Sequence, residues 1–354
     1  MAIQVYPGNT GDPTTVPDQV ERLAQQFGLS RIVLVGDRGM LTQTQISTLK
    51  EHPGLGWISC LRSGAIRDLL DEGHLNRTVF DRINLAEIHS PDFPEERLIA
   101  CYNPVLAEQR RQKRTALLVA TEALLAKLAR GVAHRTKAPL SEAEIGLKAG
   151  RVIARYKMAK HFRLTSQEGV LEWTRDEDSI RQAKLLDGIY VVRTSEPAER
   201  LSAKDSVRSS KRLSLVEGMF RCLKGLDLLV RPIHHRLEPR VRAHLLICML
   251  AYYVEWHLRQ VWRRLLFEDE DLERDRAQRD PVAAAQPSPA VRRKKAKRET
   301  VDHLWVHSFR SLLAHLGTRC LNTCQVVSDP AGTTFQQVTE LDPVQREALH
   351  LLEK

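Results

Sequence analysis

The feature that most constrains this chain is a regular alternation of strand and helix signals across its first hundred residues. The run 31–36 (RIVLVG) holds four consecutive apolar residues between an arginine and a glycine, which predicts a short strand buried on both faces. Apolar residues at helical spacing come before and after it. Helices are expected over 16–27, 42–51 and 63–72, and further strands over 2–6 and 57–61. This alternation is typical of an α/β layer structure.

The rest of the chain changes character three times. A long amphipathic helix is expected over 108–132, and short strand-like runs separated by turn residues follow it. These runs, at 156–164, 169–173 and 188–193, indicate a β-rich insertion. Patterns typical of helices return from 215 and include the apolar segment 241–266. The segment 268–300 shows little sign of regular structure and ends in a basic run at 292–298.

Composition narrows the class of protein. The chain has 54 Lys and Arg residues and 44 Asp and Glu residues, a net charge of +10. This basic excess is compatible with a polyanionic partner but does not establish one. The six cysteines include no CxxC pair, so neither a zinc ribbon nor a disulfide framework is indicated, and a reducing cytoplasm fits. The longest apolar stretch, 245–254, is about half the length of a membrane span and predicts a buried helix. No signal peptide and no membrane partner are therefore expected.

Asp37 is the first candidate for chemistry. It comes directly after the predicted strand 31–36, at the edge of an open α/β sheet where ligands bind. A turn or helix-cap acid at this place is the structural alternative. Position alone leaves both interpretations open.

Glu217 is the second candidate. Glu217, Arg221 and Lys224 lie at i, i+4 and i+7, so they share one face of a helix beside an apolar stripe. A surface ion-pair ladder is the structural alternative. The functional alternative is a carboxylate that binds a metal ion, with two cations beside it to hold phosphates.

Together these features resemble the insertion-sequence DDE transposases, in the branch with a Tyr-x2-Arg-x3-Glu-x6-Lys signature. The acid after a strand, the long insertion and the Glu-x6-Lys helix occur in the family's order. The matching segments are 6–10 (YPGNT), 35–39 (VGDRG), 81–87 (DRINLAE), 156–162 (YKMAKHF), 187–193 (DGIYVVR), 216–224 (VEGMFRCLK) and 231–236 (RPIHHR).

The resemblance implies an RNase-H-like α/β fold, a mixed sheet with flanking helices, interrupted by a β-rich insertion and followed by a helical C-terminal part. The implied divisions are a partial core over 1–105, a helical connection over 106–150, the insertion over 151–205, the catalytic helix and return to the core over 206–266, a charged flexible linker over 267–300 and a C-terminal tail over 301–354.

In such transposases three acids hold two divalent ions, usually Mg²⁺, for DNA cleavage and strand transfer. Asp37 matches the second Asp, Glu217 the closing Glu, and Lys224 the signature lysine that contacts DNA phosphate. Arg221 lies outside the signature, but its place one turn after Glu217 suits a phosphate contact. The implied partners are double-stranded DNA, as transposon ends and target, and other copies of the chain. The implied location is the bacterial cytoplasm, at the nucleoid.

Two departures from the family pattern bear on activity. Ser210 and Leu213 stand where the signature has Tyr and Arg. The first Asp of the family has no counterpart on a strand here. The only acidic residues before Glu21 are Asp12, in a turn sequence, and Asp18, at a helix start. We therefore expect an N-terminally truncated family member that is inactive alone. The alternatives are a transposase whose start lies upstream, a DNA-binding remnant or inhibitor of the intact enzyme, and a decayed fragment.

Further DNA contacts are predicted outside the acids. Trp173 ends the strand-like run 169–173 and could stack on a flipped base, as an aromatic of the insertion does in related transposases; a core tryptophan is the structural alternative. Arg231 and Arg236 belong to a basic segment suited to the DNA backbone.

Overall fold

The computed structural model describes residues 4–52, 54–135, 137–225, 228–325, 327 and 332–353, which fall into two compact units. The sheet unit comprises Gly11–Lys211 and Asp280–Ala284. The helical unit comprises Met1–Thr10, Arg212–Arg279 and Ala285–Lys354. Each unit is described by itself below.

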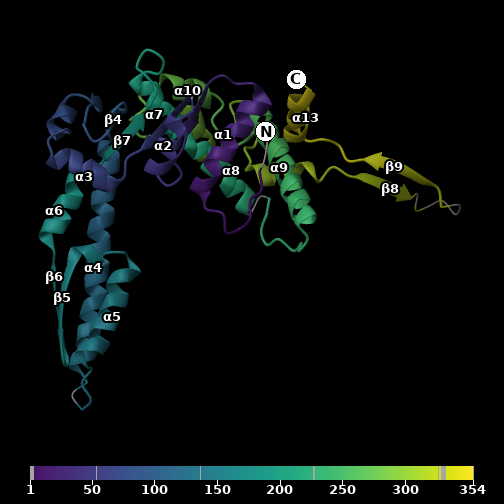
Figure 1. The fold of residues 1–354 in the computed structure, drawn as a ribbon. Coiled ribbons are helices and arrows are strands. Elements are labelled where there is room, and N and C mark those ends of the chain that lie inside the picture. The colour runs from purple at the N-terminus through teal and green to yellow at the C-terminus, as the bar shows by residue number, and fades with distance from the viewer. Residues whose placement is uncertain are drawn as a thin grey trace. The chain divides into compact units, whose positions relative to one another are not determined.

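A five-stranded mixed sheet forms the centre of the sheet unit (Figure 1). Its strands, in spatial order, are β1 (Ile32–Val35), β2 (Leu55–Cys60), β7 (Ile189–Thr194), β4 (Arg97–Tyr102) and β3 (Leu85–Ile88). β1 and β2 run parallel, and the other neighbours run antiparallel. The predicted mixed α/β class is thus confirmed.

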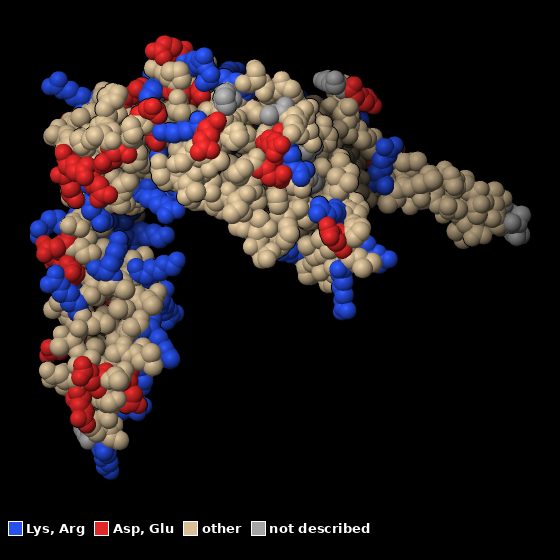
Figure 2. Space-filling view, in the orientation of Figure 1, with Lys and Arg blue, Asp and Glu red and all other residues tan. Residues whose placement is uncertain are grey.

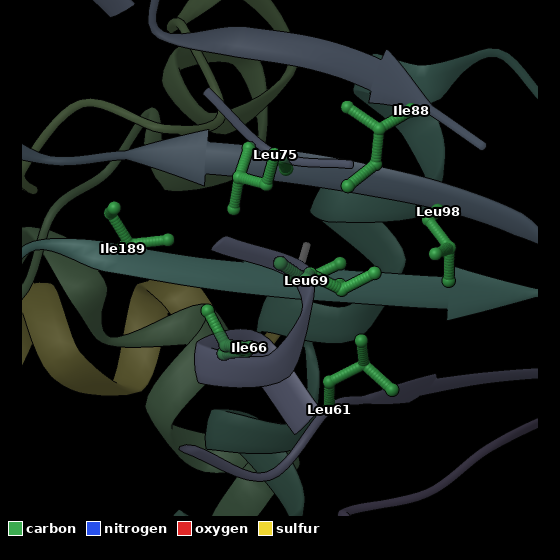
Figure 3. Packing of buried hydrophobic residues seen from close by; sticks show 9 residues of the cluster. Leu61, Ile66, Leu69, Leu75, Ile88, Leu98 and Ile189 are labelled. Carbon is green, nitrogen blue, oxygen red and sulfur yellow. The ribbon is translucent and has the colours of Figure 1, made fainter. Parts of the chain in front are cut away.

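Helices cover the sheet through three apolar clusters. The helices are α1 (Val16–Phe27), α2 (Gln43–Lys50), α3 (Ser63–Asp71) and α7 (Ala203–Lys211), with short 3-10 turns at Asp12–Thr15 and Arg77–Asp81. In Figure 3, Ile66 and Leu69 of α3 lie against Leu98 of β4 and Ile189 of β7. Val20 and Ile46 pack with Trp57 in a second cluster, and Val207 packs with Ile58 and Val192 in a third.

A helical arm is inserted between β4 and β7. Figure 1 shows α4 extending from the sheet with α5, β5 and β6 alongside it. The arm consists of α4 (Pro104–Ala133), α5 (Glu142–Arg155), a 3-10 turn (Ala159–His161), β5 (Phe162–Gln167), β6 (Val170–Arg175) and α6 (Glu177–Leu185). β5 and β6 form an antiparallel hairpin, and its side chains share a core with α4 and α5 that includes Leu125, Ile145 and Leu171.

The helical unit contains α8 (Leu213–Lys224), α9 (Glu238–Val261), a 3-10 turn (Arg263–Leu265), α10 (Leu272–Gln278), α11 (Pro289–Lys297), α12 (Phe309–Leu316), the hairpin β8 (Leu321–Gln325) and β9 (Thr334–Val338), and α13 (Pro343–Glu353). Leu223 of α8 packs with Cys248 of α9. Trp262 packs with Leu312 of α12 and Ala348 of α13. No helix in the described ranges is long and apolar enough to cross a membrane.

The predicted helices agree with the structure, but the predicted β-rich insertion does not. The expected strand 188–193 is β7, which lies between β2 and β4 in the main sheet. Among the described residues of the inserted segment, the strands are 162–167 and 170–175, which make a two-stranded hairpin. The sequence could not show this, because strand partners are chosen by long-range packing.

Two strand predictions near the N-terminus also need correction. β1 is an edge strand with Val33 38% exposed, so the expectation of burial on both faces is wrong. Of the predicted strand 2–6, residues 4–6 are irregular and 2–3 lie outside the described residues.

The helical unit corrects three further expectations. The segment 245–254 is helical, but Ile247 and Leu250 are exposed and only Cys248 and Met249 are buried. The expected flexible linker 267–300 contains α10 and α11. The Lys294 ammonium is buried and donates to the carbonyls of Arg263 (2.9 Å) and Glu268 (3.1 Å), which orders the basic run. The expected tail 301–354 packs through α12 and α13.

Both charged ends of the segment 187–193 are bound inside the sheet unit. Arg193 donates from Nε and Nη2 to the Glu96 carboxylate at 2.7 and 2.6 Å, and both residues are buried. The Arg193 guanidinium also lies 5.1 Å from the Trp57 ring centroid and 5.0 Å from that of Phe93. At the other end, Asp187 accepts from Arg114 of α4. The two ion pairs anchor β7 to the strands and helix around it.

The Glu96–Arg193 pair gives a stability prediction. Arg193→Met leaves a buried carboxylate without its cation and should destabilise the sheet unit by about 3–5 kcal/mol in urea unfolding followed by circular dichroism. Arg181→Met breaks an exposed pair with Asp178 and should cost less than about 1 kcal/mol. The double variant Glu96→Gln/Arg193→Met should lose less than Arg193→Met alone. An equal loss in Arg193→Met and Arg181→Met would contradict the structural role of the buried pair.

Candidate active site

Asp37 lies at the carboxyl end of β1, one residue beyond Gly36. Gly36 continues the β1–β2 ladder by donating to the carbonyl of Ile58 at 3.0 Å. The Asp37 side chain is exposed, so the sheet presents a carboxylate to solvent at its edge. The predicted order of strand, glycine and acid is therefore confirmed.

The Asp37 carboxylate also shapes the loop that carries it. Its Oδ1 accepts the backbone N–H of Gly39 at 2.8 Å and that of Met40 at 2.7 Å, an Asx-type turn. Oδ2 has no hydrogen bond or ion pair with any residue in the described part of the chain. One oxygen thus builds the turn and the other is available to a ligand, so the structural and functional interpretations are compatible.

Close packing holds the loop after Asp37 in place. Leu41 is buried, and a Cβ at Gly36 would lie 2.6 Å from the Leu41 Cγ, so only glycine fits there. Arg62, two residues after the end of β2, donates from Nη2 to the carbonyl of Arg38 at 3.3 Å. The loop therefore presents Asp37 together with two cations, Arg38 and Arg62, that are themselves exposed.

Cys60 and Ser210 lie at the same end of the sheet. Cys60 ends β2, and its Sγ lies 3.4 Å from the Ser210 Oγ on α7. Burial raises the pKa of the Cys60 thiol, against a smaller lowering by the Ser210 hydrogen bond and Arg38. A raised pKa favours the protonated thiol, which is the less nucleophilic form. Ser210 thus contacts the last residue of β2, the strand that pairs with β1.

Glu217, Arg221 and Lys224 all lie on α8 with exposed side chains. The Glu217–Arg221 ion pair of the structural alternative does not form, because Glu217 has no hydrogen bond or ion pair with any described residue. Lys224 Nζ lies 5.1 Å from the Phe220 ring centroid. The helix thus presents an uncommitted carboxylate and two cations on one surface.

The two acids belong to different units: Asp37 to the sheet unit and Glu217 to the helical unit. Their joint use as metal ligands therefore stays a prediction. Asp12 lies in a 3-10 turn and Asp18 in the first turn of α1, so neither stands on a strand. Carboxylate oxygens suit Mg²⁺, but the described ranges contain no group of three or more His, Cys, Asp or Glu side chains that could hold a metal ion.

The predicted DNA contacts lie in two places. Trp173 is half-buried and packs against the core of the arm, as the structural alternative predicts. Arg231 and Arg236 are exposed in the connection between α8 and α9. Their contacts with DNA stay predictions.

Sequence reasoning missed the cations around Asp37. Arg62 follows β2 by two residues, and no local pattern connects it with a loop more than twenty residues earlier in the chain. The parallel pairing of β1 with β2 is what brings these strand ends together. Parallel strands place their carboxyl ends at a common edge, so an expected parallel pairing of these two strands is the signal that could have placed Arg62 near Asp37.

Comparison with known proteins gives one match. The model of the family described as Transposase DDE domain matches residues 1–254, which is more than two thirds of the chain. Neither the curated proteins nor the solved structures gave a match. The matched range contains both acids and the whole sheet unit up to Lys211.

The Asx turn separates two roles of Asp37. Asp37→Asn keeps an oxygen that can accept from Gly39 and Met40, so thermal unfolding should place its stability within about 0.5 kcal/mol of the wild type. Asp37→Ala leaves both N–H groups without this acceptor and should cost about 1 kcal/mol. If the Asn variant were as unstable as the Ala variant, the carboxylate charge and not the turn would be the stabilising element.

Proposed function

The chain belongs to the family of transposases with a DDE domain, and we propose that it derives from the transposase of an insertion sequence. The family acts on DNA and normally uses divalent metal ions. The proposed reaction is DNA cleavage and strand transfer, with Asp37 and Glu217 as two of the acids and Mg²⁺ as the metal. The family match across both acids is the observation that carries this proposal.

The loop geometry of Asp37 supports its role. A metal-binding carboxylate must be held in place and still offer an oxygen. Asp37 meets both conditions, because Oδ1 is fixed by two N–H groups and Oδ2 is uncommitted among the described residues. Arg38 and Arg62 add positive charge for a DNA phosphate beside it.

The surface of α8 supports the roles of its three charged residues. Glu217 would bind the metal, while Lys224 and Arg221 would hold the phosphates next to the cut. Arginine and lysine both bind phosphate, the first through a planar fork and the second as a point charge. When bound, divalent ions would supply the activation of water or a DNA 3′-hydroxyl and the stabilisation of the leaving oxygen.

Two acids are fewer than this chemistry needs. The resemblance calls for three acids, and neither Asp12 in its 3-10 turn nor Asp18 in α1 stands on a strand as the first Asp of the family does. A metal pair held by two side chains would be weakly bound. We therefore propose that the chain by itself binds double-stranded DNA without cutting it. Such a protein could act as an inhibitor by entering oligomers of the intact transposase at the nucleoid.

Other surfaces would assist DNA binding in this proposal. Arg231 and Arg236 are exposed and carry no ion pair with a described residue, so both are available to the DNA backbone. Trp173 packs against the core of the arm and is only half-exposed, which makes it the weakest of the predicted contacts.

The test is cleavage of a supercoiled plasmid that carries the DNA flanking this coding sequence, with Mg²⁺, with Mn²⁺ and with EDTA. The wild-type chain should shift the plasmid in a gel without nicking it under any of the three conditions. Asp37→Asn and Glu217→Gln should bind with unchanged affinity, because neither removes a cation. Lys224→Ala should weaken binding by a few-fold, because it removes a phosphate contact.

Each other outcome has a definite meaning. Metal-dependent nicking that both acid variants abolish would confirm the two acids and overturn the proposed inactivity. Nicking that survives in either variant would overturn the assignment of that acid. Failure of the folded wild-type chain to bind DNA would overturn the proposed function.

A further inference from the structure

A basic groove runs between α4 and α5 of the arm. It has a volume of about 540 Å³, and its walls come from both helices. Its apolar lining includes Leu124, Leu128, Val132 and Val152. Its charged lining is entirely cationic: Lys127, Arg135, Lys148, Arg151 and Arg155.

These groove cations are unpaired, unlike their neighbours in the arm. Arg175 donates two hydrogen bonds of 2.7 Å to Glu122, and Arg163 pairs with Asp176 at 3.0 Å. Among the described residues, no carboxylate lies within ion-pair distance of any of the five groove cations. Five unneutralised charges on one groove repel one another, and an anionic ligand would relieve that repulsion.

One acid stands near the groove and is already engaged. Glu144 begins α5 and accepts from the Ser141 backbone N–H at 3.0 Å and from its hydroxyl at 2.9 Å. These two hydrogen bonds, with a smaller influence of Lys148 and Arg135, lower the pKa of Glu144. The Glu144 carboxylate stabilises the start of α5. Near the groove, the five cations therefore outnumber this one acid.

The spacing of the cations suits a polymer of phosphates. Lys148, Arg151 and Arg155 lie at i, i+3 and i+7 and therefore share one face of α5. Lys148 and Arg155 are seven residues apart on α5, about 10 Å along the helix axis, while Lys127 lies on α4 and Arg135 follows the end of that helix. One DNA strand carries a phosphate every ~3.4 Å along the duplex axis, so this length matches about three phosphates. Figure 2 shows Lys and Arg side chains gathered along the part of the arm that Figure 1 labels α5.

We propose that the α4–α5 groove binds the phosphate backbone of double-stranded DNA, as a surface separate from the acids and from the basic segment after α8. The proposal rests on the proposed function, which supplies the identity of the polyanion. The contacts are to phosphates, so the groove positions the duplex and does not read its sequence.

The experiment compares two double variants of the full chain. Lys127→Gln/Arg151→Gln removes one groove cation from each helix, and all of its side chains are exposed. Arg181→Gln/Lys184→Gln is the matched control, because it removes two exposed cations from α6. Affinity for a fluorescein-labelled 30-base-pair duplex is measured by anisotropy between 50 and 200 mM NaCl. Circular dichroism and light scattering establish that each variant is folded and report its oligomeric state.

The groove variant should bind at least about tenfold more weakly at 100 mM NaCl, and its log K against log salt slope should be shallower by about 1 to 2. The control should keep the wild-type slope and lie within about twofold of its affinity. Equal losses in the two variants, or no loss in either, would overturn the groove while leaving DNA binding intact. A changed oligomeric state with an unchanged slope would assign the groove to a second copy and also overturn it. Failure of the wild type to bind the duplex would overturn the proposed function itself.

Discussion

The buried ion pair between Glu96 and Arg193 is the interaction on which the sheet unit depends. Arg193 lies on β7, the middle strand, and its guanidinium is enclosed by Trp57 of β2 and Phe93 from the chain before β4. A charge in apolar surroundings is tolerated only when its hydrogen bonds are satisfied, so this contact joins β7 to β2 and to the residues just before β4. Asp37 follows β1, whose one strand neighbour among the described residues is β2, and its position therefore depends on the pairing of β2.

The charged residues of this protein divide into those that are neutralised inside a unit and those that are not. Arg114, Arg163 and Arg175 have carboxylate partners and serve the fold. Glu217 and the groove cations have none among the described residues and remain available to ligands. A protein that handles DNA needs both kinds, because paired charges order the scaffold and unpaired cations hold phosphates.

Local sequence patterns predicted the helices well and the sheet poorly. Helix 16–27 and the glycine that ends it follow from apolar spacing and from the positive φ that Gly28 adopts. The strand-like run 188–193 is expected in the insertion because turn residues separate it from similar runs before it, yet it forms β7, whose hydrogen-bond partners are β2 and β4. The segment 267–300 was expected to be flexible because it is polar, but the two carbonyls and the Glu270 carboxylate around Lys294 order it.

The sequence by itself determined the α/β class, the acid that follows β1, the shared face of Glu217, Arg221 and Lys224, and the resemblance that the family match bears out in its general form. These features are encoded within a few residues of each other. Only the tertiary structure decided that β1 is an edge strand, that β7 is central, and which cations keep their charge unneutralised. Those outcomes depend on contacts such as Glu96 with Arg193, which join residues 97 positions apart, a distance that no local periodicity reports.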